Sequence, residues 1–242
     1  MRPITRICLA ALLTAAAVLA VGSPTARAAD PEGTRNLFNG RNLRGWYRFL
    51  NGHELNEDPD KVFSVRNGRI HVSGETYGYI MTRREFENYH LIVEFRWGEK
   101  KYYPSPNRRR DSGILYHCTG EDRVWPMSIE CQIQEGDTGD FWLVGGTHIE
   151  VPFVSVSERE RNSGNYRIPK FADYEKPTGE WNSVEVLAVG DRAWHLVNGQ
   201  EVNRGEKATV ARGKILLQSE GAEVEYRRVD LHPAGNCPVC VR

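Results

Sequence analysis

Apolar side chains recur at every second position along much of this 242-residue chain, and this spacing restricts the possible folds more than any other pattern in the sequence. Residues 90–97, 114–118, 129–134 and 183–188 all alternate apolar and polar side chains in this way. Successive side chains of a β-strand point to opposite faces, whereas an amphipathic helix repeats at about 3.6 residues. The spacing therefore predicts strands with one buried face, and no segment carries a helical pattern of three turns.

Turn signals separate the strand segments. Asn67-Gly68 and Asn198-Gly199 each stand between two apolar alternations, and Asn-Gly in that position is a strong hairpin signal. About eleven short strands joined by tight turns predict an all-β protein with two antiparallel sheets, a β-sandwich or jelly roll. Without an internal repeat or a low-complexity linker, the simplest organisation is a single domain over residues 30–233 and a Cys-bearing tail over residues 234–242.

Composition excludes several classes of protein. Charged residues make up 26% of the chain and apolar residues 40%, which is ordinary for a globular domain and excludes wholesale disorder. Lysine plus arginine and aspartate plus glutamate each number 32. Because nucleic-acid binding usually needs a basic excess to neutralise phosphates, we expect no nucleic-acid partner.

The first 29 residues have the layout of a secretory signal peptide. Arg2 and Arg6 precede an apolar run over residues 7–21, and Ala26-Arg27-Ala28 forms an Ala-x-Ala cleavage site. A transmembrane anchor is the alternative, but the run is shorter than the roughly 20 residues that a span needs. We expect cleavage after Ala28 or Ala29, a secreted or periplasmic product with a small negative net charge, and no membrane association after cleavage.

The cysteines agree with export. Cys8 leaves with the signal peptide, so Cys118, Cys131, Cys237 and Cys240 remain. An even number in an exported chain predicts two disulfides. Cys118 and Cys131 lie on consecutive strand segments and could face each other, while the C-terminal CxxC could form a local disulfide or half of a zinc site.

A polar strip is predicted beside the central strands. If Ile129, Cys131 and Ile133 face the core, then Glu130 and Gln132 face away. The same alternation in neighbouring segments puts Glu94, Arg96 and His117 on this face, and the indoles of Trp125 and Trp142 flank it. We expect this face to bind a sugar, whose hydroxyls suit polar groups and whose C–H faces stack on indoles; the alternative is an ordinary solvated strand face. The expected substrate-binding residues are Glu94, Arg96, Asp111, Gln132, Trp125 and Trp142, with His117 and Glu130 as catalytic candidates.

An acidic, glycine-rich segment follows the central strands. Glu135, Asp137 and Asp140 are closely spaced oxygen ligands that could hold a divalent cation such as calcium, although the EF-hand spacing is missing. A tight turn capped by its own aspartates is the alternative. The sequence contains no phosphate-binding loop, no Gly-x-Ser-x-Gly elbow and no His-Glu-x-x-His motif.

Several short motifs, taken in order, resemble the 3-keto-disaccharide hydrolase domain family. They are Leu37–Trp46, Val65–Ile70, Asp111–Ile114, Glu130–Ile133 and residues 213–221. Asp111 stands where the family usually has Asn. The resemblance covers nearly all of the chain after the signal peptide, and it implies a concanavalin-like jelly roll that acts on carbohydrate.

The resemblance also implies a reaction. A ketone at sugar C3 acidifies the hydrogen at C2, so a base can remove it, the group at C1 leaves, and water adds to the resulting enone. His117 is a candidate base and Glu130 an alternative base or the acid, while Arg96 or a cation on the acidic turn could stabilise the enolate. Two alternatives stay open: a non-catalytic carbohydrate-binding module and a conventional glycoside hydrolase. The second is less favoured, because Glu130 alternates with Gln132 and not with another acid.

Overall fold

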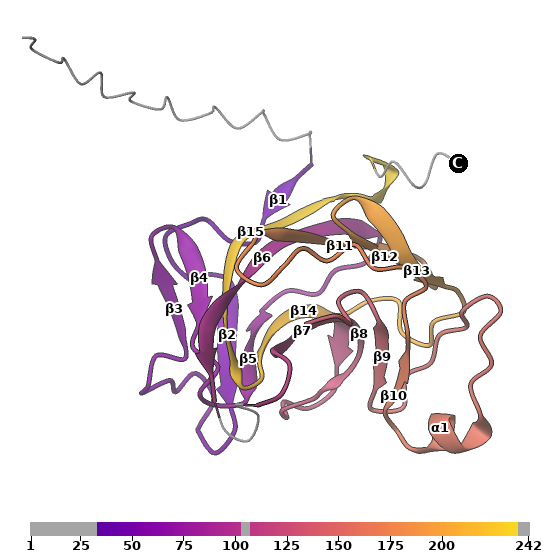
Figure 1. Cartoon of the computed structure of the whole chain (residues 1–242), viewed down its shortest axis with the longest axis horizontal. Coiled ribbons are helices and arrows are strands. Elements are labelled where there is room, and N and C mark those ends of the chain that lie inside the picture. Colours follow the sequence, from indigo (N-terminus) through magenta and orange to yellow (C-terminus); the bar gives the residue numbers. More distant parts are fainter. Residues whose placement is uncertain (1–32, 103–106, 237–242) are drawn as a thin grey trace, which may run out of the picture. The chain divides into compact units, whose positions relative to one another are not determined.

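The computed structural model describes residues 33–102 and 107–236 (Figure 1). The predicted signal peptide, Cys237 and Cys240 lie outside these residues. Within them no helix is both long and apolar enough to cross a membrane.

One sheet contains eight strands, in the order β13-β12-β11-β6-β15-β4-β3, with β1 paired to β15. Their bounds are β1 Arg35–Asn36, β3 Phe63–Arg66, β4 Arg69–Val72, β6 Tyr89–Lys101, β11 Asn182–Val189, β12 Arg192–Val197, β13 Gln200–Gly205 and β15 Ala222–Pro233.

The second sheet contains seven strands, in the order β10-β9-β8-β7-β14-β5-β2. They are β2 Trp46–Leu50, β5 Gly78–Thr82, β7 Asp111–Thr119, β8 Met127–Gln134, β9 Phe141–Val144, β10 Tyr166–Ile168 and β14 Lys214–Ser219. A five-residue helix, α1 (Glu158–Asn162), and a 3₁₀ turn, η1 (Ala234–Asn236), are the helical segments of the described chain.

Every strand pair is antiparallel, and the two sheets lie face to face, as Figure 1 shows. The core between them takes Leu91, Val93 and Phe95 from β6, and Ile129 and Ile133 from β8. These are the apolar positions of the period-two pattern, so the predicted all-β sandwich of two antiparallel sheets is confirmed.

A bulge in β7 breaks the alternation at one place. His117 has a φ of +52°, and the pairing register with β8 shifts between Tyr116 and Thr119. The extra residue turns His117 inward, where its ring packs edge-on against Tyr89 and Tyr116. Cys118 consequently joins Leu115 on the outer face of the sheet.

The bulge also explains why the predicted disulfide between Cys118 and Cys131 is wrong. Both are free, buried thiols. Cys131 lies in the core between the sheets, whereas Cys118 packs in the outer cluster with Tyr47 and Leu216. Two side chains on opposite faces of a sheet cannot bridge.

Candidate functional site

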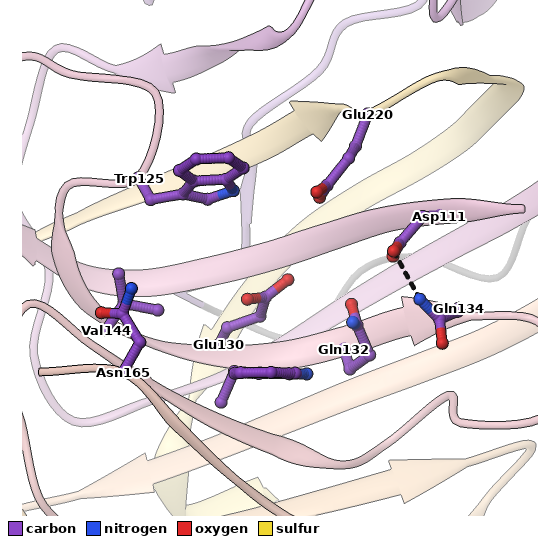
Figure 2. A pocket seen from close by; sticks show the side chains of 9 residues that line it. Asp111, Trp125, Glu130, Gln132, Gln134, Val144, Asn165 and Glu220 are labelled. Carbon is purple, nitrogen blue, oxygen red and sulfur yellow. Dashed lines mark hydrogen bonds between the residues drawn. The ribbon is translucent and has the colours of Figure 1, made fainter. Parts of the chain in front are cut away.

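A cavity of about 240 Å³ opens on the outer face of the seven-stranded sheet. Figure 2 shows the carboxyl groups of Glu130, Glu220 and Asp111 pointing into one space below the ring of Trp125. The complete lining is Asp111, Trp125, Glu130, Gln132, Gln134, Trp142, Val144, Asn165 and Glu220. None of these residues is a Lys, Arg or His.

Alternation along β8 supplies one wall of the cavity. Glu130, Gln132 and Gln134 line it, while Ile129 and Ile133 face the core. The predicted outward face of β8 is therefore correct, and Trp142 of β9 lies directly opposite Glu130 in the pairing register.

Gly113 on the neighbouring strand β7 leaves the space that Glu130 uses. A Cβ atom built on Gly113 would overlap Oε1 of Glu130 and would lie 2.9 Å from Oε1 of Gln218. The backbone of Gly113 is not in the left-handed region, so strand geometry does not demand glycine. Glycine is needed at this position because the Glu130 carboxyl occupies the space of a side chain.

Asp111 lies at the start of β7, and its Oδ2 accepts a hydrogen bond from the side-chain amide of Gln134 (Figure 2). Its other oxygen, Oδ1, is buried and has no partner among the described residues. Burial raises the pKa of Asp111 to about 6, although the Gln134 hydrogen bond and the charge of Arg109 act in the opposite direction. The carboxyl can therefore change its charge near neutral pH.

Glu220, which the sequence did not single out as a site residue, lies in the turn between β14 and β15. Burial and the charge of Asp111 raise the pKa of Glu220 to about 8, and hydrogen bonds from Trp125 and Gln218 act against this shift. The sequence signals for Glu220 are the turn pair Glu220-Gly221 and the family-like motif over residues 213–221, and neither marks it as a site residue. Its approach to β7 and β8 depends on the position of β14 beside β7.

Glu130 is 5% exposed. Burial, followed by the charges of Glu220 and Asp111, raises the pKa of this carboxyl well above its usual range. Three acids in one small cavity whose lining contains no Lys, Arg or His cannot all ionise at low cost. Near neutral pH the pocket therefore holds protonated and ionised carboxyls together, which is what general acid–base chemistry requires.

Trp125 is held over the cavity by its loop. The carboxylate of Asp122 accepts hydrogen bonds from the hydroxyls of Tyr47 at 2.7 Å and Tyr79 at 2.6 Å. The ring of Tyr77 meets Trp125 edge-on at 6.3 Å. With Trp142, Trp125 offers indole surface against which the C–H face of a sugar can pack.

The cavity continues in both directions along the sheet. At one end a space of about 420 Å³ is lined by Tyr77 and residues 107–109 and shares Asp111, Gln134 and Glu220. At the other end a space of about 370 Å³ is lined by Arg123, Gly145 and Gly164 and shares Trp125 and Asn165.

The cavity lining lacks three of the predicted catalytic and substrate-binding residues, Glu94, Arg96 and His117. Glu94 and Arg96 lie on β6 in the other sheet, so the prediction that one face displays them with Glu130 is wrong. Glu94 accepts from Arg227, and Arg96 pairs with Glu225 at 2.6 Å.

His117 is separated from the cavity by the bulge in β7. Its Nδ1 donates to the carbonyl oxygen of Val210 at 3.2 Å, and its Nε2 is buried without a partner among the described residues. Burial lowers the pKa of His117 to about 4, so the ring is neutral over most of the pH range. The structure does not bring this ring together with the pocket acids.

The acidic turn is neutralised by arginines and not arranged as a cation site. Glu135 pairs with Arg110 at 2.8 Å. Asp137 pairs with Arg109 at 2.6 Å and with Arg167 at 2.9 Å, and Arg167 also bonds the buried Asp140. Over residues 33–102 and 107–236 no group of three or more His, Cys, Asp or Glu side chains could hold a metal ion.

Comparison with solved structures agrees with this architecture. A candidate glycosyl hydrolase of Parabacteroides distasonis is 22% identical, with a TM-score of 0.58 over 84% of this chain and 94% of that one. A β-glucanase of Bacillus licheniformis is 12% identical, with a TM-score of 0.52 over 81% of this chain and 96% of that one. The carbohydrate-binding module CBM66 of Bacillus subtilis is 13% identical, with a TM-score of 0.51 over 77% of this chain and 94% of that one. At these identities the likeness shows the fold, a concanavalin-like jelly roll.

Fold and cavity together define a jelly-roll protein with an acid-lined pocket on the outer face of one sheet. Residues 33–232 match the model of the 3-keto-alpha-glucoside-1,2-lyase-like domain. The chain belongs to this family. None of the curated proteins compared with the chain matches it.

Proposed function

We propose that the protein cleaves glycosides whose sugar carries a ketone at C3, and that it does so outside the cytoplasm. The observation that carries the proposal is the cluster of Asp111, Glu130 and Glu220, three carboxyls with raised pKa values in one cavity. Membership of the lyase-like family supports the ketone-bearing substrate. The signal-like N-terminus supports export.

The reaction needs one base and one acid. An ionised carboxylate takes the proton from C2, the C2–H electrons form the enolate of the C3 ketone, and the C1–O bond then breaks. A protonated carboxyl gives its proton to the departing oxygen. Asp111 is the proposed base, because its pKa of about 6 is the lowest resolved among the three and leaves it ionised at neutral pH. Glu130, the most deeply buried of the three, is the proposed acid.

Water can then add across the C1–C2 double bond, so that the net result is hydrolysis. The enolate oxygen needs hydrogen-bond donors. Neither Arg96 nor the acidic turn can supply them, because neither lines the cavity. Donors in this lining include the side-chain amides of Gln132 and Asn165, the indole N–H of Trp142 and a protonated Glu220.

The test is an assay on 3-oxidised disaccharides beside the same sugars unoxidised, in ordinary and heavy water, with and without chelator. We expect release of the C1 group only from the oxidised sugar, and deuterium at C2 of the hydrated product beyond the exchange of product alone. Asp111→Asn and Glu130→Gln should each lower kcat at least a hundredfold, as loss of acid–base catalysis does. The matched controls His117→Asn and Glu94→Gln should stay within about threefold of the parent.

Other outcomes would assign other functions. Release from unoxidised sugar, without deuterium at C2, would contradict the elimination and favour a conventional glycoside hydrolase. A glycoside hydrolase needs a second acid beside Glu130, and Gln132 on the same strand is not one. Asp111 of β7 and Glu220 in the turn after β14 supply such acids in the cavity. Sugar binding without any turnover would favour a carbohydrate-binding module.

A further inference from the structure

Two side chains from non-adjacent strands meet above Gly113. Strand β7 lies between β8 and β14, so Glu130 of β8 and Gln218 of β14 approach Gly113 from opposite sides. Oε1 of Glu130 and Oε1 of Gln218 both crowd the point where a Cβ of Gly113 would stand. The missing side chain at Gly113 therefore lets the carboxyl and the amide come together.

The amide of Gln218 lacks one hydrogen-bond partner. The residue is 1% exposed, and its Oε1 is buried with no donor among the described residues. A buried acceptor without a donor is unfavourable, because it has lost its hydrogen bonds to water and gained none in exchange. Its other end is occupied, since the side chain of Gln218 hydrogen-bonds to Glu220. An amide that donates its N–H to Glu220 presents its oxygen to Glu130.

The groups around Glu130 disfavour its negative charge. Burial acts first, and the charges of the two neighbouring acids, Glu220 and Asp111, add to it. The described lining contains no basic side chain to oppose them. A neutral Glu130, by contrast, has an O–H to give and an acceptor close to it.

We propose that Gln218, acting across the gap left by Gly113, is the positioning residue that keeps the proton on Glu130, by accepting the O–H of that carboxyl while its own amide N–H donates to Glu220. This inference rests on the proposed function only where it concerns catalysis. Gln218 then decides which carboxyl enters the reaction as the acid, and Gly113 keeps the path between the two side chains open.

A carboxyl titration by infrared or carbon-13 spectroscopy tests this arrangement without any substrate. The signal of Glu130 is the one that disappears in Glu130→Gln. In Gln218→Leu the neutral carboxyl loses its acceptor, so we expect the midpoint of Glu130 deprotonation to fall by about one pH unit, a tenfold change in ionisation. A midpoint that stays or rises would overturn the proposal, because an amide turned the other way would stabilise the charged form.

Gly113→Ala provides a second test that leaves Gln218 intact. The new methyl group should push the Glu130 carboxyl away from Gln218 and lower the same midpoint. Gly98→Ala is a matched control. Gly98 lies in the eight-stranded sheet, away from the cavity, and is also a strand glycine without a left-handed φ. Its Cβ would meet the side chain of Glu223 on the neighbouring strand. This control should not move the Glu130 signal; equal shifts in both alanine variants would contradict the proposal.

Kinetics then separate this inference from the proposed function. If the elimination is correct, the alkaline limb of kcat/KM should move to lower pH in Gln218→Leu, by the same amount as the spectroscopic midpoint. A shifted titration in a protein that turns over no oxidised sugar would uphold the proton arrangement and refute the function. An unshifted titration in an enzyme that cleaves the oxidised sugar would refute the proton arrangement and uphold the function.

Discussion

At the scale of single residues, the pocket is defined by what its acids lack. Asp111, Glu130 and Glu220 face one another with amides and indoles around them, whereas the acids of the nearby turn, Asp137 among them, are each matched to arginine. An ion pair on a solvated surface contributes little to stability, but buried acids without such a pair hold protons that other carboxyls have already released. The same residue type thus serves two purposes within a few positions of sequence.

The buried carboxyl should make stability depend on pH. Folded Glu130 keeps its proton above the ordinary glutamate pKa, and unfolded Glu130 loses it, so its contribution to stability is complete below about pH 4 and is lost as the pH rises. As the pH rises from 5 to 8, we expect the free energy of unfolding of Glu130→Gln to increase relative to that of the parent by at least about 1 kcal/mol. Urea unfolding at the two pH values measures this difference.

The control for that experiment lies on the other sheet. Glu94 pairs with Arg227 and Arg228 on an outer face, so the effect of Glu94→Gln should be small and nearly equal at pH 5 and pH 8. A Glu130→Gln difference that is also equal at the two pH values would mean that Glu130 is ionised in the folded protein.

At the scale of elements, the bulge in β7 redistributes side chains between two faces. Before it, Gly113 and Leu115 lie on the same outer face as Glu130, which Leu115 pairs with directly. After it, Cys118 takes an outward place that simple alternation would give to His117. A bulge changes the side of every following residue in the strand.

The cysteines report on this bulge. Burial raises the pKa of both thiols, Cys118 and Cys131, so neither should react readily in the folded state. Peptide mapping after alkylation without reductant should find both unmodified in native protein and both modified in denaturant. A linked peptide containing Cys118 and Cys131 would contradict the register of β7.

At the scale of the whole molecule, the outer faces of the two sheets carry different kinds of polar side chains. The seven-stranded sheet carries the cavity, while the outer face of the eight-stranded sheet carries arginines around Trp181, with Arg227 at 4.3 Å and Arg96 at 4.9 Å from the ring centre. Long antiparallel contacts such as β6 with β15 bring distant segments together. A polar residue can therefore be near the site in sequence and belong to the far side of the sandwich.

The protein as released from its source should lack its first residues. We expect the intact mass of a chain that begins at Ala29 or Asp30, since signal peptidase cuts after an Ala-x-Ala pattern. Mass spectrometry of the protein from the medium or periplasm of an expressing bacterium measures it. A retained N-terminus in a membrane fraction would instead support the anchor that the short apolar run disfavours.

The fold class and about half of the pocket lining follow from the local pattern of side chains. Period-two alternation fixes which side chains of β8 face outward, because a one-residue change of face would bury Glu130 and expose Ile129. Asp111, Trp125 and Trp142 followed from their places beside that strand.

The other residues of the pocket depend on which strands lie side by side. Strand order put Glu94 and Arg96 on the other sheet, and a bulge that alternation does not reveal turned His117 inward. Glu220, Gln218 and Gly113 became site residues because β14 pairs with β7 across about a hundred residues of chain. Local patterns specify the faces of a strand, but the choice of neighbouring strand depends on packing of the whole core, and no short segment records it.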